Sequence, residues 1–172
     1  SQGALQLNEL VREILPSLRD KYFIAHQMGR KQYTAADGPG YRTFGFIGEE
    51  MPDFLAAADL VICRAGANTL AELSVLGKPA VLVPLAAGAG RGDQVKNARL
   101  FAEEGAAIIL EGEDATAEKL ETAVHSVLDS PAAAESLSDN MLRLARRDAA
   151  KAVVREIQIG RASCRERVCH RV

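Results

Sequence analysis

Residues 60–79 constrain the fold of this chain more than any other stretch of its sequence. Residues 60–63 are all apolar and predict a buried strand of a parallel sheet. The stretch 64–69, made mostly of small residues, predicts a turn that lets a ligand approach the backbone closely. A helix is expected from Asn68 or Thr69 onward, with leucines on one face and a glycine and a proline at its end.

The expected strand, turn and helix together form a site suited to an anion. At a helix N-terminus the first N–H groups have no partner within the helix, and the helix dipole favours negative charge there. We expect Glu72 to lie in the first turn, where its carboxylate can accept hydroxyl groups beside that anion. A phosphate beside a vicinal diol indicates a nucleotide. The residues alone support this function and an ordinary helix cap at Thr69, with Glu72 in solvent, about equally.

Strands alternate with helices along the rest of the chain, a pattern that predicts a doubly wound α/β fold with a parallel sheet. Pro16 is expected to close the first helix or to kink its end. In such sheets ligands bind beyond the carboxyl ends of the strands, so the turns after Cys63 and Val83 are expected at the binding edge. Besides residues 60–63, strands are expected at 22–26, 41–47, 80–83 and 106–110. Further helices are expected at 4–15, 51–58, 93–104, 116–128, from 131 onward, and at 148–158.

Composition and charge limit the class of protein. The 172 residues are enough for one α/β domain, and 48% hydrophobic with 26% charged residues is typical of a globular domain. A net charge of −2 gives no electrostatic case for binding nucleic acid or an anionic membrane. No apolar run approaches the roughly 20 residues of a membrane-spanning helix. Cys63, alone in an expected core strand, fits a reducing cytoplasm.

Both ends of the sequence depart from those expected of a complete domain. The chain starts at Ser1 without an initiator methionine, so we expect a piece of a longer protein. Residues 159–172 interrupt the preceding helical periodicity and resemble a translated sequencing adapter, which predicts a non-native read-through tail. We therefore expect one domain at 1–158, and we exclude Cys164 and Cys169 in the tail as metal ligands.

Four motifs occur in an order that resembles a known family. They are SQGA at 1–4, HQMGR at 26–30, ADLVICRAG at 58–66 and DQVKNA at 93–98. Together they closely resemble the C-terminal half of the MurG family, glycosyltransferase family 28, over residues 1–157. This family consists of inverting transferases that move GlcNAc from UDP-GlcNAc onto the lipid-linked muramyl-pentapeptide of peptidoglycan synthesis. The resemblance implies a two-domain GT-B fold in which this half is a Rossmann-like domain for the donor nucleotide-sugar.

The resemblance also implies a donor site drawn from several parts of the chain. Thr69 is expected to donate its hydroxyl and amide to the diphosphate, and Glu72 to accept both ribose hydroxyls. Gln94 is expected to contact hydroxyl groups of GlcNAc. The expected donor-binding residues are Ser1, Ile47, Ala67, Asn68, Thr69, Leu70, Ala71, Glu72 and Gln94.

Three of these contacts have ordinary alternatives that the residues alone favour. Ser1 opens a helix and reads as an N-cap, whereas the family implies contact with the nucleotide-sugar. Ile47 reads as a core strand residue, whereas the family implies an apolar wall for the uracil, with Phe46 or Gly48 as alternatives. An isolated Gln94 is most simply a surface side chain, and the motif around it shifts the expectation toward the sugar.

Other polar residues near the motifs suit ligand contact less well. His26 can titrate near neutral pH as a general base, but a hydrogen-bonded structural histidine is favoured. Arg64 can approach the diphosphate or form an ion pair at the strand end, and neither role is preferred. Asn97 is expected to support its loop, while Asp93 is left as a second contact to the sugar. No cluster of His, Cys and Asp predicts a metal site, and no cofactor is expected besides the UDP-GlcNAc donor substrate.

The expected function is donor binding rather than complete catalysis. The family implies that the general base and the acceptor-lipid surface lie in a missing N-terminal domain. We therefore assign no catalytic residue and expect the chain alone to transfer nothing. The full-length protein is expected in the cytoplasm, at the inner face of the cell membrane, without nucleic-acid partners. Two alternatives remain: the donor-binding subunit of a two-chain GlcNAc transferase, and a dinucleotide-binding domain, whose G-x-G-x-x-G motif is absent here.

Overall fold

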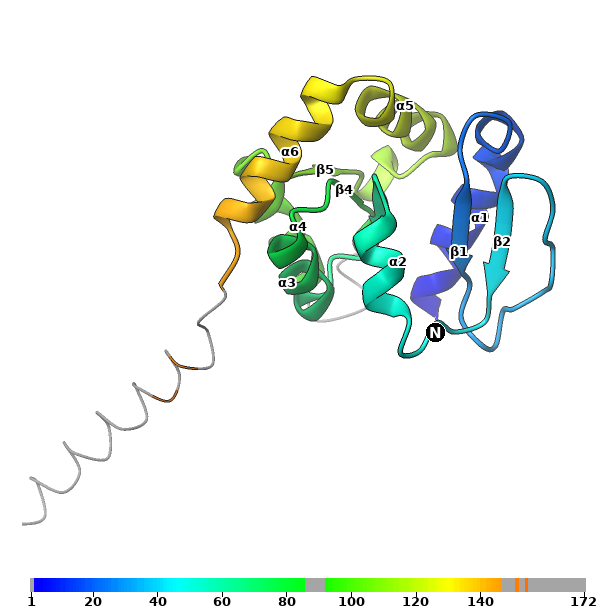
Figure 1. Cartoon of the computed structure of the whole chain (residues 1–172), viewed down its shortest axis with the longest axis horizontal. Coiled ribbons are helices and arrows are strands. Elements are labelled where there is room, and N and C mark those ends of the chain that lie inside the picture. Colours follow the sequence, from blue (N-terminus) through cyan, green and yellow to red (C-terminus); the bar gives the residue numbers. More distant parts are fainter. Residues whose placement is uncertain (1, 86–91, 147–150, 152–153, 155–172) are drawn as a thin grey trace, which may run out of the picture.

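Helices and strands alternate along the chain in the computed structural model, which describes residues 2–85, 92–146, 151 and 154 (Figure 1). This order confirms the α/β class. Ser1, most of the helix expected at 148–158 and the tail at 159–172 lie outside the described residues. The strands are β1 (Ile24–Gln27), β2 (Tyr41–Phe44), β3 (Val61–Cys63), β4 (Ala80–Leu82) and β5 (Ala107–Ile109). The helices are α1 (Gln2–Leu18), α2 (Met51–Ala57), α3 (Ala67–Leu76), α4 (Asp93–Glu103), α5 (Ala117–Leu128) and α6 (Pro131–Arg143), with a 3₁₀ turn, η2, at Gly112–Asp114.

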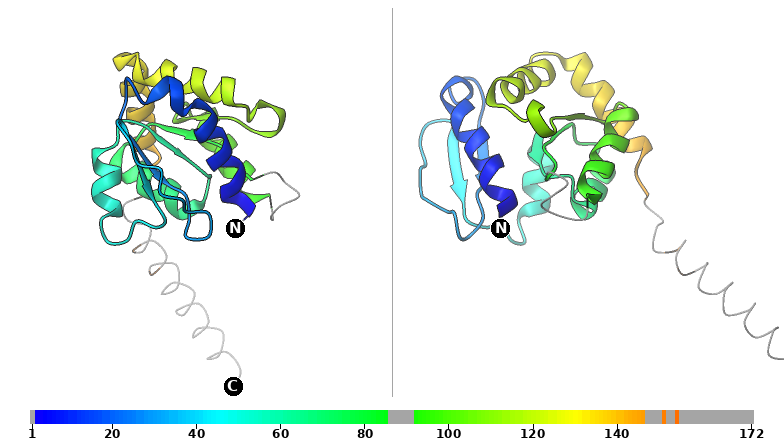
Figure 2. Two further views of the ribbon diagram at one scale, coloured as in Figure 1. Left: turned by 90° about the vertical axis from the view of Figure 1, so that its right-hand side faces the viewer. Right: turned by 180° about the vertical axis from the view of Figure 1, so that it is seen from behind.

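Strands β1 to β5 pair in parallel and form two sheets. β1 pairs with β2, with Ile24 opposite Tyr41, and β4 lies between β3 and β5. Figures 1 and 2 show the β1–β2 pair beside the three-stranded sheet. The expected parallel pairing is confirmed, but the strands divide between two sheets rather than joining in one. Helices α3 and α4 connect β3 to β4 and β4 to β5, as parallel strands require.

One buried cluster lies between β4, α1 and α5. On α1, Leu10, Ile14 and Leu18 recur at four-residue spacing, so they share the helix face that enters the core. They join Val81 of β4 and Leu120 of α5, and helices α1 and α5 contact each other directly. This packing fixes the direction of α1, whose N-terminus carries the SQGA motif.

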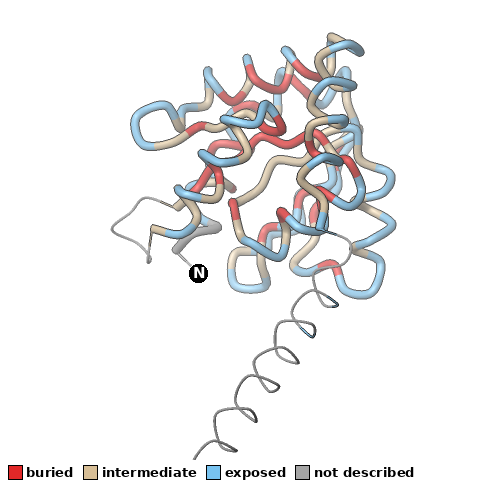
Figure 3. Tube along the Cα trace, turned by 90° about the vertical axis from the view of Figure 1, so that its left-hand side faces the viewer, coloured by how far each residue is buried: buried red, intermediate tan, exposed pale blue. Residues whose placement is uncertain are grey.

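A second buried cluster covers the opposite face of β4. Leu82 meets Leu73 of α3, Ala98 of α4 and Met141 of α6 there. Successive side chains of a strand point to opposite faces, so Val81 and Leu82 enter different clusters and β4 is buried on both sides. Figure 3 shows buried segments inside the molecule and exposed ones on its outer turns.

Helix α1 continues past its proline. Of the two expected effects of Pro16, closure of the helix was wrong, because the helix runs on to Leu18 with Pro16 inside it, and a kink stays a prediction. Pro16 has no N–H to donate to the carbonyl of Arg12. Both residues are exposed, so water can satisfy that carbonyl instead.

Helix α3 ends where its glycine predicts. Gly77 has a φ of 62°, in the left-handed region that favours glycine. The Gly77 N–H donates to the Ser74 carbonyl at 3.3 Å, and the Lys78 N–H donates to the Leu73 carbonyl at 3.0 Å. This pair of bonds is a Schellman motif, so the predicted left-handed stop is confirmed.

Candidate functional site

The turn between β3 and α3 leaves the first amides of the helix open. Gly66, with φ −72° and ψ 138°, is the N-cap residue, and no side chain caps the helix there. The Leu70 N–H donates to the Gly66 carbonyl at 2.9 Å, so the preceding amides of Ala67, Asn68 and Thr69 have no acceptor within the helix. Strand, turn and helix therefore occur in the expected order, and this end of α3 suits an anion.

Helix α3 begins earlier than the sequence indicated, and this moves its carboxylate. The helix was expected from Asn68 or Thr69 but starts at Ala67, because Gly66 adopts the extended backbone of an N-cap. Glu72 therefore lies in the second turn, and its expected place in the first turn was wrong. The side chain is exposed, and its role toward a ribose stays a prediction.

The remaining side chains at this end of α3 divide between solvent and core. Ala67, Asn68 and Ala71 are exposed, and Thr69 is half-buried. Leu70 is only 2% exposed and packs in the cluster on the α3 side of β4. Leu70 thus anchors the helix end with its side chain, while its N–H is used within the helix. A ligand at this turn can therefore reach Ala67, Asn68, Thr69 and Ala71 more readily than the side chain of Leu70.

Arg64 joins the ends of β3 and β4. Its Nη1 donates to the carbonyls of Val83 and Pro84 at 2.6 and 3.1 Å, and its Nη2 donates to Gln6 Oε1 at 3.3 Å. Burial lowers the pKa of Arg64, since the charged guanidinium loses water. These bonds place the Arg64 side chain at the strand ends. Its acceptors at the end of β4 are backbone carbonyls, not the carboxylate of an ion pair.

Two amide side chains of α4 bond to the backbone of the segments that follow β3 and β4. Asn97 Nδ2 donates to the Ala65 carbonyl at 3.2 Å, in the turn after β3. The glycine loop that Asn97 was expected to support lies at 86–92, mostly outside the described residues, so that role stays a prediction. Gln94 Oε1 accepts from the Leu85 N–H at 3.1 Å. Because an N–H only donates, this bond turns the amide oxygen toward Leu85 and leaves the Nε2 donors for another partner. Contact between Gln94 and a sugar stays a prediction.

The third part of the expected site follows β2. Ile47 lies past the end of that strand, so it is not a strand residue, and it is 8% exposed. Its N–H donates to Gln27 Oε1 at 2.7 Å. Phe46 is 59% exposed, and the Arg30 guanidinium lies 4.8 Å from the centroid of its ring. The sequence interpretation missed Gln27, although its place at the end of an expected strand was a usable signal.

His26 belongs to a buried polar network that joins α1 to the β1–β2 pair. Its Nδ1 lies 2.8 Å from the Tyr41 hydroxyl, and its Nε2 lies 3.0 Å from Asn8 Oδ1. Asn8 Nδ2 also donates to the Met28 carbonyl at 2.9 Å. Burial lowers the pKa of His26 to about 4, so the ring is neutral at neutral pH. These contacts confirm the structural role favoured for His26.

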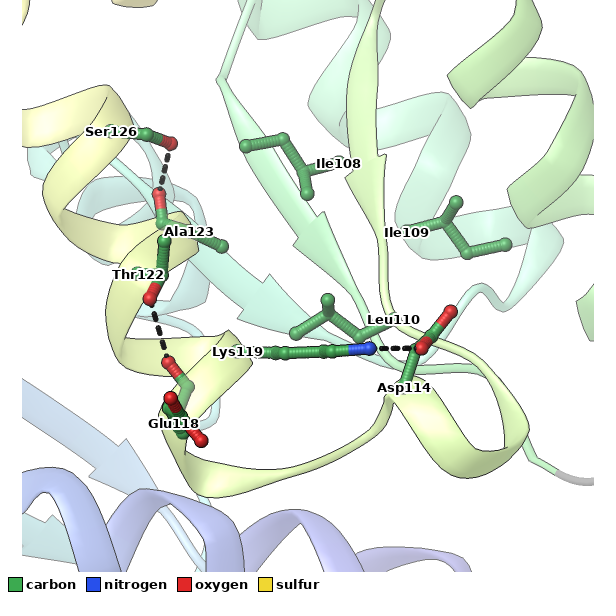
Figure 4. A pocket seen from close by; sticks show the side chains of 9 residues that line it. All are labelled: Ile108, Ile109, Leu110, Asp114, Glu118, Lys119, Thr122, Ala123 and Ser126. Atoms are coloured by element: carbon green, nitrogen blue, oxygen red, sulfur yellow. Dashed lines mark hydrogen bonds and ion pairs between the residues drawn. The ribbon is translucent and has the colours of Figure 1, made fainter.

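A separate hollow of about 440 Å³ opens between β5 and α5 (Figure 4). An ion pair between Asp114 and Lys119 crosses it, and the hydroxyls of Thr122 and Ser126 donate to carbonyls within α5. None of the residues expected to bind the nucleotide-sugar lines this hollow, so we do not assign the donor to it. Its walls are Ile108, Ile109, Leu110, Asp114, Glu118, Lys119, Thr122, Ala123 and Ser126.

The described part of the chain offers neither a metal site nor a reactive cysteine. Within it, no group of three or more His, Cys, Asp or Glu side chains is placed to hold a metal ion. None of the helices in the described ranges combines the length and apolar character that crossing a bilayer requires. Burial raises the pKa of the Cys63 thiol to about 12, so this cysteine is a protonated core residue rather than a nucleophile.

Comparison with known sequences identifies the family. The sequence model of the glycosyltransferase family 28 C-terminal domain matches residues 1–153. A UDP-N-acetylglucosamine–N-acetylmuramyl-(pentapeptide) pyrophosphoryl-undecaprenol N-acetylglucosamine transferase from Geobacillus thermodenitrificans is 41% identical over 132 residues, which are 76% of this chain and 37% of that protein. Transferase 2 of the same description from Bacillus cereus is 45% identical over 122 residues, 70% of this chain and 35% of the relative.

Solved structures agree with the sequence comparison. MurG from Acinetobacter baumannii matches with a TM-score of 0.75 and 32% identity, over 91% of this chain and 46% of that one. The glycotransferase of kitacinnamycin matches with a TM-score of 0.65 and 26% identity, over 86% of this chain and 38% of its own. The chain thus spans less than half the length of these relatives. With its residues 1–153 matching the C-terminal domain and its fold matching MurG, this chain belongs to glycosyltransferase family 28.

Proposed function

We propose that this chain binds UDP-GlcNAc as the donor-nucleotide half of an enzyme that transfers GlcNAc to a lipid-linked muramyl-pentapeptide. The descriptions of the Geobacillus and Bacillus relatives name this donor sugar and this acceptor. One observation carries the proposal: the N-terminus of α3, open to an anion, lies within residues 1–153 that match family 28. The donor is an anion joined to a diol, which is the chemistry that this turn and Glu72 suit.

Each part of the donor has a proposed partner. The diphosphate binds the amides of Ala67, Asn68 and Thr69, whose orientation and helix dipole offset part of its charge. Glu72 is exposed beyond this turn and accepts both ribose hydroxyls. Gln94, whose oxygen is held by the Leu85 N–H, offers its Nε2 donors to the sugar. The proposed contacts also include the Ser1 end of α1, the apolar Ile47, and Ala71, which precedes Glu72 on α3.

The proposed reaction is a direct displacement that inverts the anomeric carbon. The acceptor hydroxyl attacks that carbon while its bond to the UDP oxygen breaks, and UDP leaves with the bonding electrons. Negative charge grows on the departing diphosphate, so donors at the start of α3 stabilise the transition state more than the ground state. The hydroxyl proton passes to a general base that we place outside this chain. We therefore propose that the chain alone binds the donor and transfers no GlcNAc.

The acceptor sets the cellular location of the proposed reaction. An undecaprenyl chain is held by a membrane, so the complete enzyme must work at a membrane surface, and we propose the cytoplasmic face. The part that contacts the lipid-linked acceptor is proposed to lie in the remainder of the enzyme. This division leaves the present chain with the water-soluble nucleotide-sugar as its own ligand.

Calorimetric titration with UDP-GlcNAc tests the proposal. Glu72→Ala is expected to weaken binding roughly 10- to 100-fold, because two charge-assisted hydrogen bonds to the ribose are lost. Glu118→Ala is the matched control, since Glu118 is also an exposed helical glutamate and lies on α5. A folded chain that does not bind UDP-GlcNAc contradicts the proposed function. Equal binding by the Glu72 and Glu118 variants contradicts the role of Glu72.

A further inference from the structure

Strand β5 is the last strand of its sheet, and among the described residues no strand pairs with its outer edge. The Leu110 N–H donates to the Leu82 carbonyl at 2.9 Å, so Leu110 and, two residues earlier, Ile108 direct their backbone groups toward β4. Directions alternate along a strand, so the N–H and C=O groups of Ala107 and Ile109 point to the open edge. Unpaired groups in such a row are a template for a further strand.

The hollow between β5 and α5 lies along this open edge (Figure 4). Figure 4 shows Ile108 pointing toward α5 and Ile109 pointing away from it, so Ile108 and, on α5, Ala123 supply apolar wall. The volume of about 440 Å³ falls within the range of roughly 300–1,000 Å³ found for ligand sites. The Asp114–Lys119 ion pair that crosses the hollow is exposed, so it contributes little to stability and can open for an incoming chain.

The rim of the hollow is acidic. Residues 111–121 carry five carboxylates and one lysine. Lys119 pairs with Asp114, and Arg99 of α4 pairs with Glu111. Within the part of the chain that the structure describes, no salt bridge reaches the other carboxylates of this segment, and one of them, Glu118, lines the hollow. This charge attracts a basic partner and repels a second copy of the same edge, whose rim would carry the same charges.

We infer that the open edge of β5 and the facing side of α5 form a docking groove for an extended, basic peptide segment of a partner protein. The segment adds to the sheet as a further strand, bonded to the backbone of Ala107 and Ile109. Every second side chain of the segment is apolar and enters the hollow against Ile108, while basic side chains meet Glu118. In this mode of recognition the backbone bonds give affinity, and the pocket and charges give specificity. The inference does not depend on the proposed function, because none of the proposed donor contacts lines the hollow.

A seven-residue peptide of alternating lysine and valine, capped at both ends and labelled with a fluorophore, is the probe. The 172-residue chain is titrated into it at low salt, with fluorescence anisotropy as the measurement, and a Kd of about 100 μM or tighter is expected. Binding should also slow hydrogen exchange of the Ile109 N–H, because a bonded amide exchanges more slowly. Two control peptides, one with glutamate in place of lysine and one N-methylated at two adjacent central amides, should each bind at least about tenfold more weakly.

The substitution Ile109→Pro tests the edge directly. Its N–H points away from β4, so proline removes a donor at the open edge and no bond of the ladder with β4. Peptide binding should weaken at least about tenfold. Glu118→Lys reverses a charge in the wall, should weaken binding at least about fivefold, and covers an Ile109→Pro chain that fails to fold. Glu135→Lys is the matched control, an exposed helical glutamate on α6 outside the hollow, and should stay within about twofold of wild type.

The outcomes decide between strand addition and other uses of this edge. A folded chain that does not bind the lysine–valine peptide refutes the inference. Equal binding of the N-methylated peptide, or unchanged exchange of the Ile109 N–H in the complex, refutes strand addition, because charge attraction alone then explains the binding. Self-association of the free chain that Ile109→Pro abolishes, measured by sedimentation, assigns the edge to a second copy and overturns the inference. Loss of binding in Ile109→Pro and Glu118→Lys but not in Glu135→Lys, with protection of the Ile109 N–H, supports it.

Discussion

His26 is expected to make the stability of this fold depend on pH. The ring is 7% exposed, and burial, with the nearby charge of Arg12, lowers its pKa from 6.5 to about 4. Asn8 uses both hydrogens of its amide elsewhere, so its oxygen accepts from Nε2 of His26. Nδ1 then accepts from the Tyr41 hydroxyl, and the neutral ring satisfies both partners. A proton added to this ring is therefore unfavourable in the folded state.

The direction and size of the effect follow from the two pKa values. In the unfolded chain His26 keeps its ordinary pKa of 6.5, so between 6.5 and about 4 the unfolded state binds more protons and stability falls as the pH falls. The difference between these values, at about 1.36 kcal/mol per pKa unit, sets a limit of about 3 kcal/mol. From about pH 7.5 to about pH 5 the free energy of unfolding should decrease by about 2 kcal/mol. This is a large share of the stability of an ordinary domain.

Urea unfolding at a series of pH values in this range measures the loss. His26→Gln is the control, because its amide can donate to Asn8 and accept from Tyr41 without titrating, and the decrease should shrink to less than about 1 kcal/mol. The series stops near pH 5 because hydrogen bonding to Lys21 lowers the pKa of Asp129, whose contribution is lost at more acidic pH. A wild-type chain whose stability changes no more than that of His26→Gln would refute the reasoning.

Two further pairs of substitutions, each a test and its control, probe the packing behind the proposed site by urea unfolding at neutral pH. Gly77→Ala strains a backbone at φ 62° and brings its new Cβ to 2.8 Å from Leu142 Cγ. It should cost more than about 2 kcal/mol, whereas Gly112→Ala, with no atom within 4 Å of its Cβ, should cost only about 1 kcal/mol. Leu73→Ala empties a site with 0% exposure and should cost about 3 kcal/mol, against less than about 1 kcal/mol for Leu76→Ala at 40% exposure. Equal costs within either pair would contradict the packing described here.

The β3–α3 region was predictable because its signals are local. Apolar residues before the turn indicated the strand, and Gly77 indicated the end of the helix, and both occur. The start of α3 was misplaced because the helical pattern was taken to begin at Asn68 or Thr69, whereas Gly66 is the N-cap and no side chain caps the helix. That shift of the helix start is also why Glu72 was expected one turn too early.

The contacts that organise the site were not predictable, because they join residues far apart in the sequence. Gln27 reaches Ile47, and Arg64 reaches Val83, across different strands. Hydrophobic periodicity indicates which face of an element is buried but not which polar side chain meets which backbone group. The division of the strands into two sheets was not predictable for a similar reason, since alternation of strands and helices does not specify which strand edges pair.

Side-chain amides hold the irregular backbone on which the proposed site depends. Turns leave N–H and C=O groups that no strand or helix satisfies, and such groups are costly to bury without partners. Gln27 and Gln94 each accept from a turn N–H, at Ile47 and Leu85, and each is left with its NH₂ group facing another way. Together with the open amides at the start of α3, these two side chains offer N–H donors on this side of the fold. Phosphate oxygens accept hydrogen bonds, so these donors suit the diphosphate of the proposed donor, while Glu72 is the proposed acceptor for its ribose hydroxyls.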